Sequence, residues 1–350
     1  MKVSIKTFVA GVAACMAVAS ADVLAADISG AGATFPYPIY AKWADSYKKE
    51  TGDELNYQSI GSGGGIAQIT ARTVTFGASD IPLTAKELAA GGDLVQWPMV
   101  MGGIVPVVNI DGVKANDITL DGPTLAKIFL GEIKTWNDAA IEKLNPTVKF
   151  PAAAIAVVHR ADGSGTTFNF TNYLGKLSPE WASKIGSAAS VEWPVGIGAK
   201  GNEGVAANVQ QTKNSIGYVE TAYAKQNKLT TTKMVNKDGK TVEATGASVQ
   251  AAAANADWAH SDGFYLIITD QPGAEAWPIS ASTFILMPKK VTDAAASQAA
   301  LKFFAWAYAN GDKAAEALDY VPMPENVKKL VMSRWAEITG PDSKRVFASK

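Results

Sequence analysis

The segment at residues 157–170 (VVHRADGSGTTFNF) carries side chains that bind anions, together with one that should repel them. Arg160 can donate two parallel hydrogen bonds to an oxyanion, and the hydroxyls of Ser164 and Thr166 can donate one each. The glycines between them allow backbone N–H groups to approach a bound anion closely. Asp162 lies in the middle of this cluster, so its carboxylate must orient the arginine, take part in chemistry or select among anions.

Three other segments, at residues 30–36 (GAGATFP), 61–65 (GSGGG) and 77–80 (GASD), have the same glycine-rich composition where a strand should lead into a helix. The N-terminus of a helix presents unpaired N–H groups and a partial positive charge, so such turns bind anions without lysines. A simpler interpretation is that each Ser or Thr only caps its helix, and that Asp80 caps a helix beginning near Pro82. Several such turns in one chain, with an arginine in one of them, favour an anion site.

Known enzymatic signatures fit this sequence poorly. No GxxxxGK[ST] loop is present, residues 30–35 lack the third glycine of a dinucleotide fingerprint, and residues 163–165 (GSG) do not form a GxSxG elbow. His159 and His260 are the only histidines, which is a poor supply for a Ser–His–Asp triad or a metal centre. Because His159 precedes Arg160 on one strand, its side chain should face the opposite side. We therefore expect no cofactor, no bound metal and no catalytic residue.

The composition describes a globular protein with a large core. The chain has 350 residues, longer than one ordinary domain, so two lobes are the natural expectation. Hydrophobic residues make up 47% of the chain and charged residues 19%. A formal net charge of −1 provides no field that would attract a nucleic acid or a membrane surface. An anion site must therefore rest on local dipoles and one or two positive groups.

The first 25 or 26 residues have the pattern of a secretory signal peptide. Lys2 and Lys6 precede an apolar run at residues 8–18, and a stretch of small residues follows that ends at residues 25–26. The run is too short for a membrane span. Cys15, the only cysteine, lies inside this segment, so cleavage leaves no cysteine for a disulfide or a metal site. Lipid anchoring at Cys15 is the alternative, but the residues after it stay apolar, which favours simple cleavage.

Short apolar runs alternate with amphipathic stretches along the rest of the chain, which is typical of an α/β protein. Residues 36–50 predict a helix with Pro in its first turn and Gly52 just beyond its end. The apolar run at residues 100–110 should cross between two lobes. Further strands are expected at 55–60, 74–78, 155–158, 215–219 and 280–288, further helices at 66–71, 167–174, 202–211, 297–308 and 324–338, and a turn at 236–239 between two short strands.

Taken together, the motifs resemble one known family, the periplasmic phosphate-binding proteins of bacterial high-affinity phosphate ABC transporters. The similar segments are GAGATFP at 30–36, KWAD at 42–45, FGASD at 76–80, VVHRADGSGTTFNFTNYL at 157–174, GNEGVAANVQ at 201–210, IGYVE at 216–220 and KFFAWAY at 302–308. They cover essentially the whole exported chain in the family's order and spacing. The resemblance implies a two-lobed α/β fold of the type II solute-binding class, with a ligand cleft between lobes that are joined by two crossover segments. After a signal peptide at 1–25, one lobe would hold residues 26–106 and 281–350 and the other residues 107–280.

The resemblance also implies a set of phosphate-binding residues. Asp162 would orient Arg160, two residues away on the same strand face. Asp80 would accept the proton of the bound phosphate. Sulfate carries no such proton, and at about 4 Å and an effective dielectric constant near 20 two like charges cost about 4 kcal/mol, so this carboxylate can reject sulfate. The full set is the Thr34 hydroxyl, the Phe35 N–H, the Ser62 hydroxyl and Asp80 from one lobe, and Arg160, Asp162, Ser164, the Gly165 N–H and Thr166 from the other.

The leading interpretation is a non-enzymatic, monomeric protein of the periplasm that captures inorganic phosphate. It would deliver phosphate to the permease subunits of an ABC transporter and would bind no nucleic acid. One alternative is a phosphomonoesterase on the same scaffold with Ser164 or Thr34 as nucleophile, although it lacks an evident base and an exit for the ester group. The other is a receptor for another oxyanion such as sulfate or molybdate, which Asp80 and Asp162 disfavour.

Overall fold

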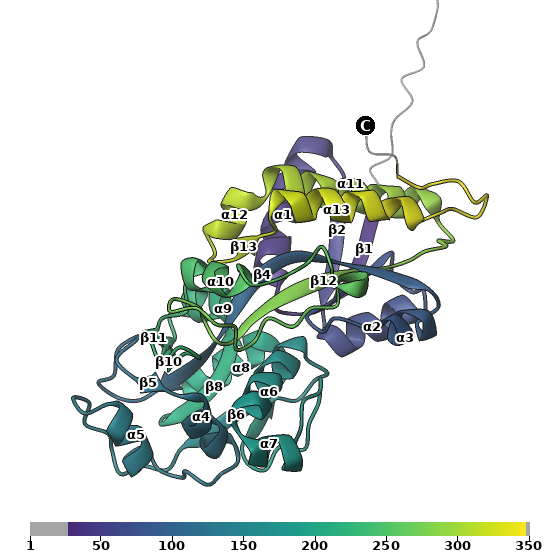
Figure 1. Ribbon diagram of the computed structural model, residues 1–350. Helices are drawn as coiled ribbons and strands as arrows, with labels where there is room; N and C mark the ends of the chain where they lie inside the picture. The colour runs from purple at the N-terminus through teal and green to yellow at the C-terminus, as the bar shows by residue number, and fades with distance from the viewer. Residues whose placement is uncertain (1–26, 348–350) are drawn as a thin grey trace, which may run out of the picture.

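The computed structural model describes residues 27–347, and the expected signal peptide with Cys15 lies outside this range. Figure 1 shows an elongated molecule with an upper and a lower α/β part, joined at the centre by long strands. The upper part carries both ends of the described chain. Its elements are β1 (Asp27–Gly32), α1 (Tyr37–Thr51), β2 (Glu54–Ser59), α2 (Ser62–Thr70), β3 (Phe76–Ser79), α3 (Ala85–Ala90), β12 (Ser280–Pro288), α11 (Ala294–Asn310), α12 (Asp312–Glu316), β13 (Val321–Pro322) and α13 (Glu325–Arg334).

The lower part is built from the middle of the chain, and a small three-stranded sheet, in the order β11-β10-β5, lies beside it. Its elements are β5 (Thr119–Leu120), α4 (Gly122–Phe129), α5 (Ala139–Leu144), β6 (Ala156–Arg160), α6 (Gly165–Leu177), α7 (Pro179–Lys184), β7 (Ile197–Ala199), α8 (Gly201–Gln211), β8 (Ser215–Glu220), α9 (Thr221–Gln226), β9 (Thr230–Thr231), β10 (Lys233–Val235) and β11 (Thr241–Val242). α10 (Gly246–Ala253) lies near the junction of the two parts, against β13 and β4 (Leu94–Asn109).

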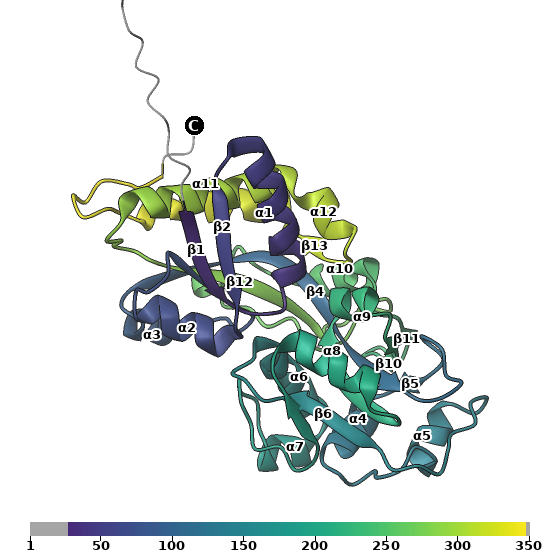
Figure 2. The same ribbon diagram turned by 180° about the vertical axis from the view of Figure 1, so that it is seen from behind.

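One sheet runs through both parts in the order β2-β1-β3-β12-β4-β8-β6-β7, with β13 and β9 also paired to β4. β1 is parallel to β2 and β3 in the upper part, and β6 is parallel to β7 and β8 in the lower part. In parallel pairs the carboxyl ends of the strands lie on one edge, where ligands of open α/β sheets bind. The turns after β1, β2, β3, β6 and β7 therefore come together between the two parts, as the back view shows for α1, α8 and α6 (Figure 2).

β4 is the strand that connects the two parts. Its first residues pair antiparallel with β12, and its last six, from Ile104 to Asn109, pair with β8. All of its residues but the last are buried, which fits a strand covered on both faces. The predicted crossing segment at 100–110 is thus the second half of a longer strand. The exact division into residues 26–106 with 281–350 and residues 107–280 stays a prediction.

Most of the remaining predicted elements agree with the structure, but α2 begins at Ser62, four residues before the expected helix at 66–71, so most of the glycine segment at 61–65 is helical and not a turn. The expected helix at 36–50 is α1, which ends at Gly52 in a left-handed conformation (φ +85°). The predicted turn at 236–239 connects β10 and β11, which pair antiparallel. The expected helix at 324–338 is shorter than predicted, because α13 ends at Arg334 and a 3₁₀ turn follows over Trp335–Glu337.

Candidate anion-binding site

Arg160 is the last residue of β6, and only 1% of its side chain is exposed. Its Nε and Nη2 donate to the two oxygens of Asp162 at 2.7 and 2.5 Å, and the Gly201 N–H donates to the same carboxylate at 3.0 Å. Burial would raise the pKa of Asp162, but the hydrogen bond and charge of Arg160 hold it below its usual value. Nη1 of Arg160 forms no hydrogen bond with any described residue. The predicted pairing of the two side chains is therefore present, and it leaves one guanidinium nitrogen for a ligand.

Asp80 directly follows β3 and is 1% exposed. Neither of its carboxylate oxygens forms a hydrogen bond of acceptable geometry within residues 27–347. Burial raises the pKa of Asp80 to about 7. The hydroxyl of Thr283, which the pairing of β12 with β3 places opposite, the charge of Arg160 and the hydroxyl of Ser62 lower it only in part. The site thus holds an unpaired acceptor that changes its charge near neutral pH.

The helix-cap interpretation fails for most of these residues. Asp80 lies outside α3, whose N-cap is Thr84, so the alternative interpretation of Asp80 as a cap for a helix near Pro82 is wrong. Neither Thr34 nor Ser62 makes a side-chain cap bond to α1 or α2. Only Ser164 is a true N-cap, because its hydroxyl accepts a backbone N–H of the first turn of α6 at 3.0 Å.

The hydroxyl of Ser62 connects the two parts of the molecule. It accepts the N–H of Asp80 at 3.1 Å and the N–H of Gly165 at 3.0 Å. Nearby, the Gly63 N–H donates to the Gly163 carbonyl at 2.9 Å. A Cβ on Gly165 would approach Ser62 Oγ to 2.5 Å and Asp80 Oδ2 to 2.8 Å, so this position requires glycine. The glycine turns of the two parts therefore meet face to face around Asp80.

Thr34 and Thr166, from opposite parts, are connected by Asn202, a residue that sequence reasoning missed. Nδ2 of Asn202 donates to Thr34 Oγ1 at 2.7 Å and to Thr166 Oγ1 at 3.1 Å. All three side chains are at most 2% exposed. A signal was available, since residues 201–204 (GNEG) open α8 after β7 as another glycine-containing turn. That turn contains no Ser or Thr, so it does not match the glycine and hydroxyl pattern by which the other turns were recognised.

Phe35 is fully buried, and contacts to its carbonyl hold the first turn in place. The Tyr320 hydroxyl lies 2.6 Å from that carbonyl and 2.8 Å from the carboxyl group of Glu220. The Tyr223 hydroxyl donates to the carbonyl of Thr34 at 2.7 Å. Burial raises the pKa of Glu220 well above its usual value. None of these three supporting residues was predicted.

Asn169 is another buried amide that sequence reasoning missed. It lies on α6, and its Nδ2 donates to the carbonyl of Asp80 at 2.8 Å and to the carbonyl of Gly165 at 2.9 Å. It therefore bridges the same two turns as Ser62 does, but through backbone oxygens. The sequence around an asparagine in an amphipathic helix does not indicate that its side chain makes such a contact.

His159 faces away from the site, as predicted from strand alternation. Its ring stacks on Trp193 with centroids 4.7 Å apart and planes at 14°. Burial lowers the pKa of this histidine. Within residues 27–347, no group of three His, Cys, Asp or Glu residues is arranged to hold a metal ion, and none of the helices combines the length and hydrophobicity of a membrane span.

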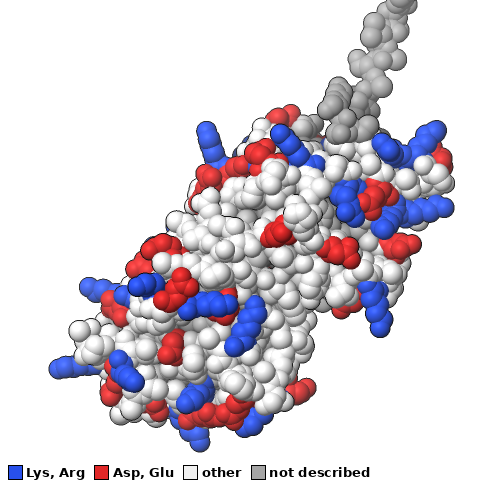
Figure 3. Space-filling model, in the orientation of Figure 1, with Lys and Arg blue, Asp and Glu red and all other residues white. Residues whose placement is uncertain are grey.

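The charged groups of the site lie largely below the molecular surface: Asp80 and the Arg160 side chain are 1% exposed and the Asp162 side chain is 12% exposed. Figure 3 shows Lys and Arg intermixed with Asp and Glu over both parts, with a mostly uncharged band between them on this face. No single sign of charge gathers there, in agreement with the net charge of −1. That buried local groups would hold an anion here stays a prediction.

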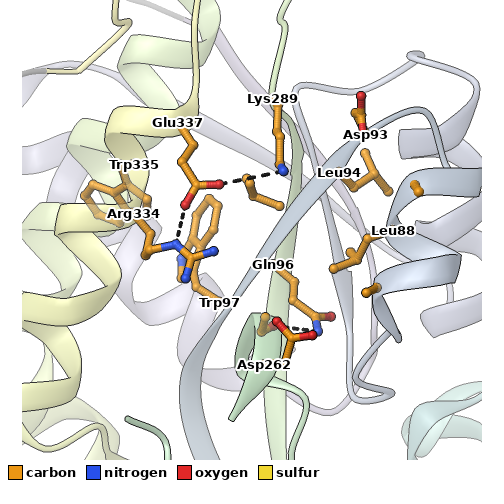
Figure 4. A pocket seen from close by; sticks show the side chains of 14 residues that line it. Leu88, Asp93, Leu94, Gln96, Trp97, Asp262, Lys289, Arg334, Trp335 and Glu337 are labelled. Atoms are coloured by element: carbon orange, nitrogen blue, oxygen red, sulfur yellow. Dashed lines mark hydrogen bonds and ion pairs between the residues drawn. The ribbon is translucent and has the colours of Figure 1, made fainter. Parts of the chain in front are cut away.

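A separate pocket of about 240 Å³ lies in the upper part, and Figure 4 shows the side chains that line it. None of the predicted anion ligands lines it. Its charged side chains largely pair with each other, since Glu337 bonds Arg334 and lies 3.7 Å from Lys289. The amide of Gln96 donates to the carbonyls of Leu83 and Gly263. This pocket therefore offers no set of unpaired donors comparable to the anion-binding site.

The sequence matches curated proteins along most of its length. Phosphate-binding protein PstS of Xylella fastidiosa (strain Temecula1) is 54% identical over 309 residues, covering 88% of this chain and 85% of that protein. Phosphate-binding protein PstS of Pasteurella multocida is 52% identical over 321 residues, covering 91% and 93%. The family model of the PBP superfamily domain matches residues 17–310.

Solved structures show the same fold at lower identity. A high-affinity periplasmic phosphate-binding protein (PfluDING) bound with phosphate is 22% identical, with a TM-score of 0.70 and coverage of 88% of this chain and 94% of that one. A phosphate-binding protein from Stenotrophomonas maltophilia is 21% identical, with a TM-score of 0.68 and coverage of 92% and 99%. The two-lobed architecture is thus confirmed. By its sequence similarity, the chain belongs to the PBP superfamily and, within it, to the family of PstS phosphate-binding proteins.

Proposed function

We propose that the protein binds inorganic phosphate between its two lobes and delivers it to the permease of an ABC transporter. The observation that carries this proposal is the unpaired carboxylate of Asp80, buried beside the free Nη1 of Arg160 and among hydroxyl and N–H donors. The ligand set comprises Thr34, Phe35, Ser62, Asp80, Arg160, Asp162, Ser164, Gly165 and Thr166, with Asp162 acting through Arg160. The Gly165 N–H donates to Ser62 Oγ in this structure, so it would have to share its proton with the ligand. The names of the relatives, which are phosphate-binding proteins at 52–54% identity, support the same ligand.

The donor pattern favours phosphate over sulfate. Ser62 Oγ accepts two N–H groups and Thr34 Oγ1 accepts two more, so each hydroxyl retains only its proton and can only donate to a ligand. Asp80 is the acceptor in this group. Phosphate keeps at least one proton near neutral pH and can donate it to that carboxylate, whereas sulfate has none. Sulfate would meet an unrelieved like charge there.

The same hydrogen bonds weigh against the phosphomonoesterase alternative. A nucleophilic hydroxyl attacks with a lone pair, and both lone pairs of Thr34 are engaged by N–H donors. Ser164 uses one lone pair to cap α6, and neither histidine contacts it: His159 stacks on Trp193, and His260 bonds Asp257 at the surface. Thr34, Ser62, Asp80, Ser164 and Thr166 are also at most 2% exposed, which disfavours an anion that carries an ester group. We therefore propose a binding protein without catalytic activity.

We also propose that the protein is exported and that it transfers phosphate to a membrane permease. The signal-peptide pattern of residues 1–25 supports a periplasmic protein, with cleavage after Ala25 or Ala26 favoured over lipid anchoring at Cys15. A monomer is sufficient, because one chain supplies every proposed ligand group. The permease subunits are proposed as partners by the family's role in transport.

Calorimetric titration of the purified protein tests this function. We expect saturable binding of phosphate at one site per chain, much weaker binding of sulfate, and no turnover of phenyl phosphate. Tighter binding of sulfate than of phosphate would favour the other oxyanion receptor. Release of phenol at a rate that depends on Ser164 or Thr34 would establish the esterase instead.

A further inference from the structure

Asn202 occupies a position between the two lobes that determines what the neighbouring hydroxyls can do. Its backbone N–H donates to Thr34 Oγ1 at 3.2 Å and its Nδ2 donates to the same oxygen at 2.7 Å. A hydroxyl has two acceptor lone pairs and one proton. Both lone pairs of Thr34 are therefore occupied, and its proton must be donated to another group. The second proton of Nδ2 goes to Thr166 Oγ1 at 3.1 Å and occupies one of its lone pairs.

The orientation of this amide is fixed by the backbone. The Oδ1 of Asn202 accepts the N–H of Glu220 at 2.9 Å, and a backbone N–H can only donate. The NH₂ group must therefore point toward Thr34 and Thr166, because a flipped amide would place two donors against each other. Asn202 is fully buried, so water does not compete for these bonds.

We propose that Asn202 is a positioning residue for anion selection, whose amide occupies acceptor lone pairs of Thr34 and Thr166 so that these hydroxyls donate to the bound anion. Ser62 is held in the same donor state by the backbone N–H groups of Asp80 and Gly165. As a result, Asp80 is the group in this site that accepts a proton from the ligand. This inference rests on the proposed function, since it concerns how the same site handles a protonated anion.

The proton count of the complex follows from this arrangement. At slightly acidic pH, free phosphate is mainly the dihydrogen form, and burial holds the pKa of Asp80 at about 7, so this carboxyl group is also largely protonated. We expect the complex to retain one proton between phosphate and Asp80, because the hydroxyls of Ser62 and Thr34 have no free lone pair for a further proton. Binding should therefore release protons. The ionisable groups that act on Asp80 are Tyr40, Tyr57, Arg160 and Tyr320, and those near Asn202 and the two hydroxyls are Asp162, Glu203, Glu220 and Tyr223.

The test is calorimetric titration with inorganic phosphate at pH 6 in two buffers with different ionisation enthalpies, which measures the protons released per phosphate bound. Asn202→Ala frees one lone pair on Thr34 and one on Thr166. We expect it to release fewer protons than wild type, by up to one, and to bind phosphate about tenfold more weakly. Asn208→Ala is the matched control, because its amide on the same helix donates only to the Gly204 carbonyl. It should keep the wild-type affinity and proton release.

A second variant protects the test against misfolding. Asn202→Asp keeps the size of the side chain and its bond to the Glu220 N–H, but it replaces the NH₂ donors with acceptors. At pH 8 the Thr34 hydroxyl should turn toward the new carboxylate, and phosphate affinity should fall at least a hundredfold. Wild-type proton release in Asn202→Ala, or affinity within threefold of wild type in Asn202→Asp, overturns the role of Asn202. Absence of phosphate binding in the wild-type protein would instead overturn the proposed function itself.

Discussion

The two carboxylates of the site, Asp80 in the upper lobe and Asp162 in the lower, have the same chemistry and opposite environments. Asp162 receives two hydrogen bonds from Arg160 and one from the Gly201 N–H, and its pKa is lowered despite its burial. Asp80 receives no well-formed hydrogen bond from any described residue, although the nearby hydroxyls of Thr283 and Ser62 lower its pKa in part, and burial raises that pKa to about 7. The carboxylate of Asp162 forms its hydrogen bonds within the protein, whereas the carboxylate of Asp80 is available to a ligand.

The difference shows how an anion site can contain two negative charges. Asp162 balances the single positive charge of the guanidinium and orients it, so the pair presents a fixed donor with little net field. Asp80 costs free energy to keep ionised, and that cost is recovered only by a ligand that brings a proton. An aspartate can therefore lie beside an anion if its carboxylate has a positive or proton-donating partner, which is Arg160 for Asp162 and the ligand proton for Asp80. The following predictions test this contrast, from the largest expected effect to the smallest.

Arg160→Ala should have the largest effect. It removes the guanidinium and leaves Asp162 buried without its partner, next to the anion. Loss of one member of a buried charged pair costs about 2–5 kcal/mol, so phosphate affinity should fall by some two to three decades. Calorimetry measures the change, with Arg72→Ala as the control, since that guanidinium bonds only the Ile69 and Gly92 carbonyls. Near-native affinity would mean that the guanidinium does not contact the ligand.

Asp80→Asn should change the choice of anion. The amide keeps an acceptor oxygen but removes the negative charge, so phosphate should lose little affinity and sulfate should gain most. The relief of a like charge at about 4 Å is worth about 4 kcal/mol at an effective dielectric constant near 20, which sets the upper limit of the gain. Titrations of both anions against wild type, Asp80→Asn and the remote helix cap variant Asp138→Asn measure it. An unchanged phosphate-to-sulfate ratio would place selectivity elsewhere.

The pH dependence of stability should also distinguish Asp80. Its pKa is raised from 3.8 to about 7 on folding, so ionisation destabilises the folded state: the penalty is absent below about pH 4 and complete above about pH 7. Between pH 5 and pH 7 the wild-type free energy of unfolding should fall by about 2 kcal/mol relative to Asp80→Asn. Denaturant titrations without phosphate provide the comparison. If the free energy of unfolding changes with pH in the same way in both proteins, the carboxyl group of Asp80 is not buried without a partner.

Closure of the lobes should give the smallest signal. The proposed ligand groups come from both lobes, and bonds such as Gly63 N–H to the Gly163 carbonyl form only when the lobes meet. A bound anion bridges the lobes, so phosphate should reduce the radius of gyration measured by small-angle scattering. Sulfate at the same concentration serves as the control ligand. An identical radius with and without phosphate would argue against a hinge.

Much of the site could be predicted from sequence because its parts are local. The strand-to-helix turns, the pairing of Arg160 with Asp162 and the outward direction of His159 follow from neighbours in the chain and from the two-residue period of a strand. Helix ends were predicted to within a few residues by Pro and Gly positions, as at Gly52. The resemblance of the motifs then identified the family.

The tertiary structure alone decided which turns face each other and what supports them. Ser62 meets Gly165 from 103 residues away in the chain, and Asn202 meets Thr34 from 168 residues away. Thr283 reaches Asp80 because β12 returns beside β3. These contacts depend on strand order and on the closure of two lobes, which no local period encodes. The residue types at each turn can therefore be understood from the sequence, whereas the unpaired state of Asp80 exists only because distant strands bury it together.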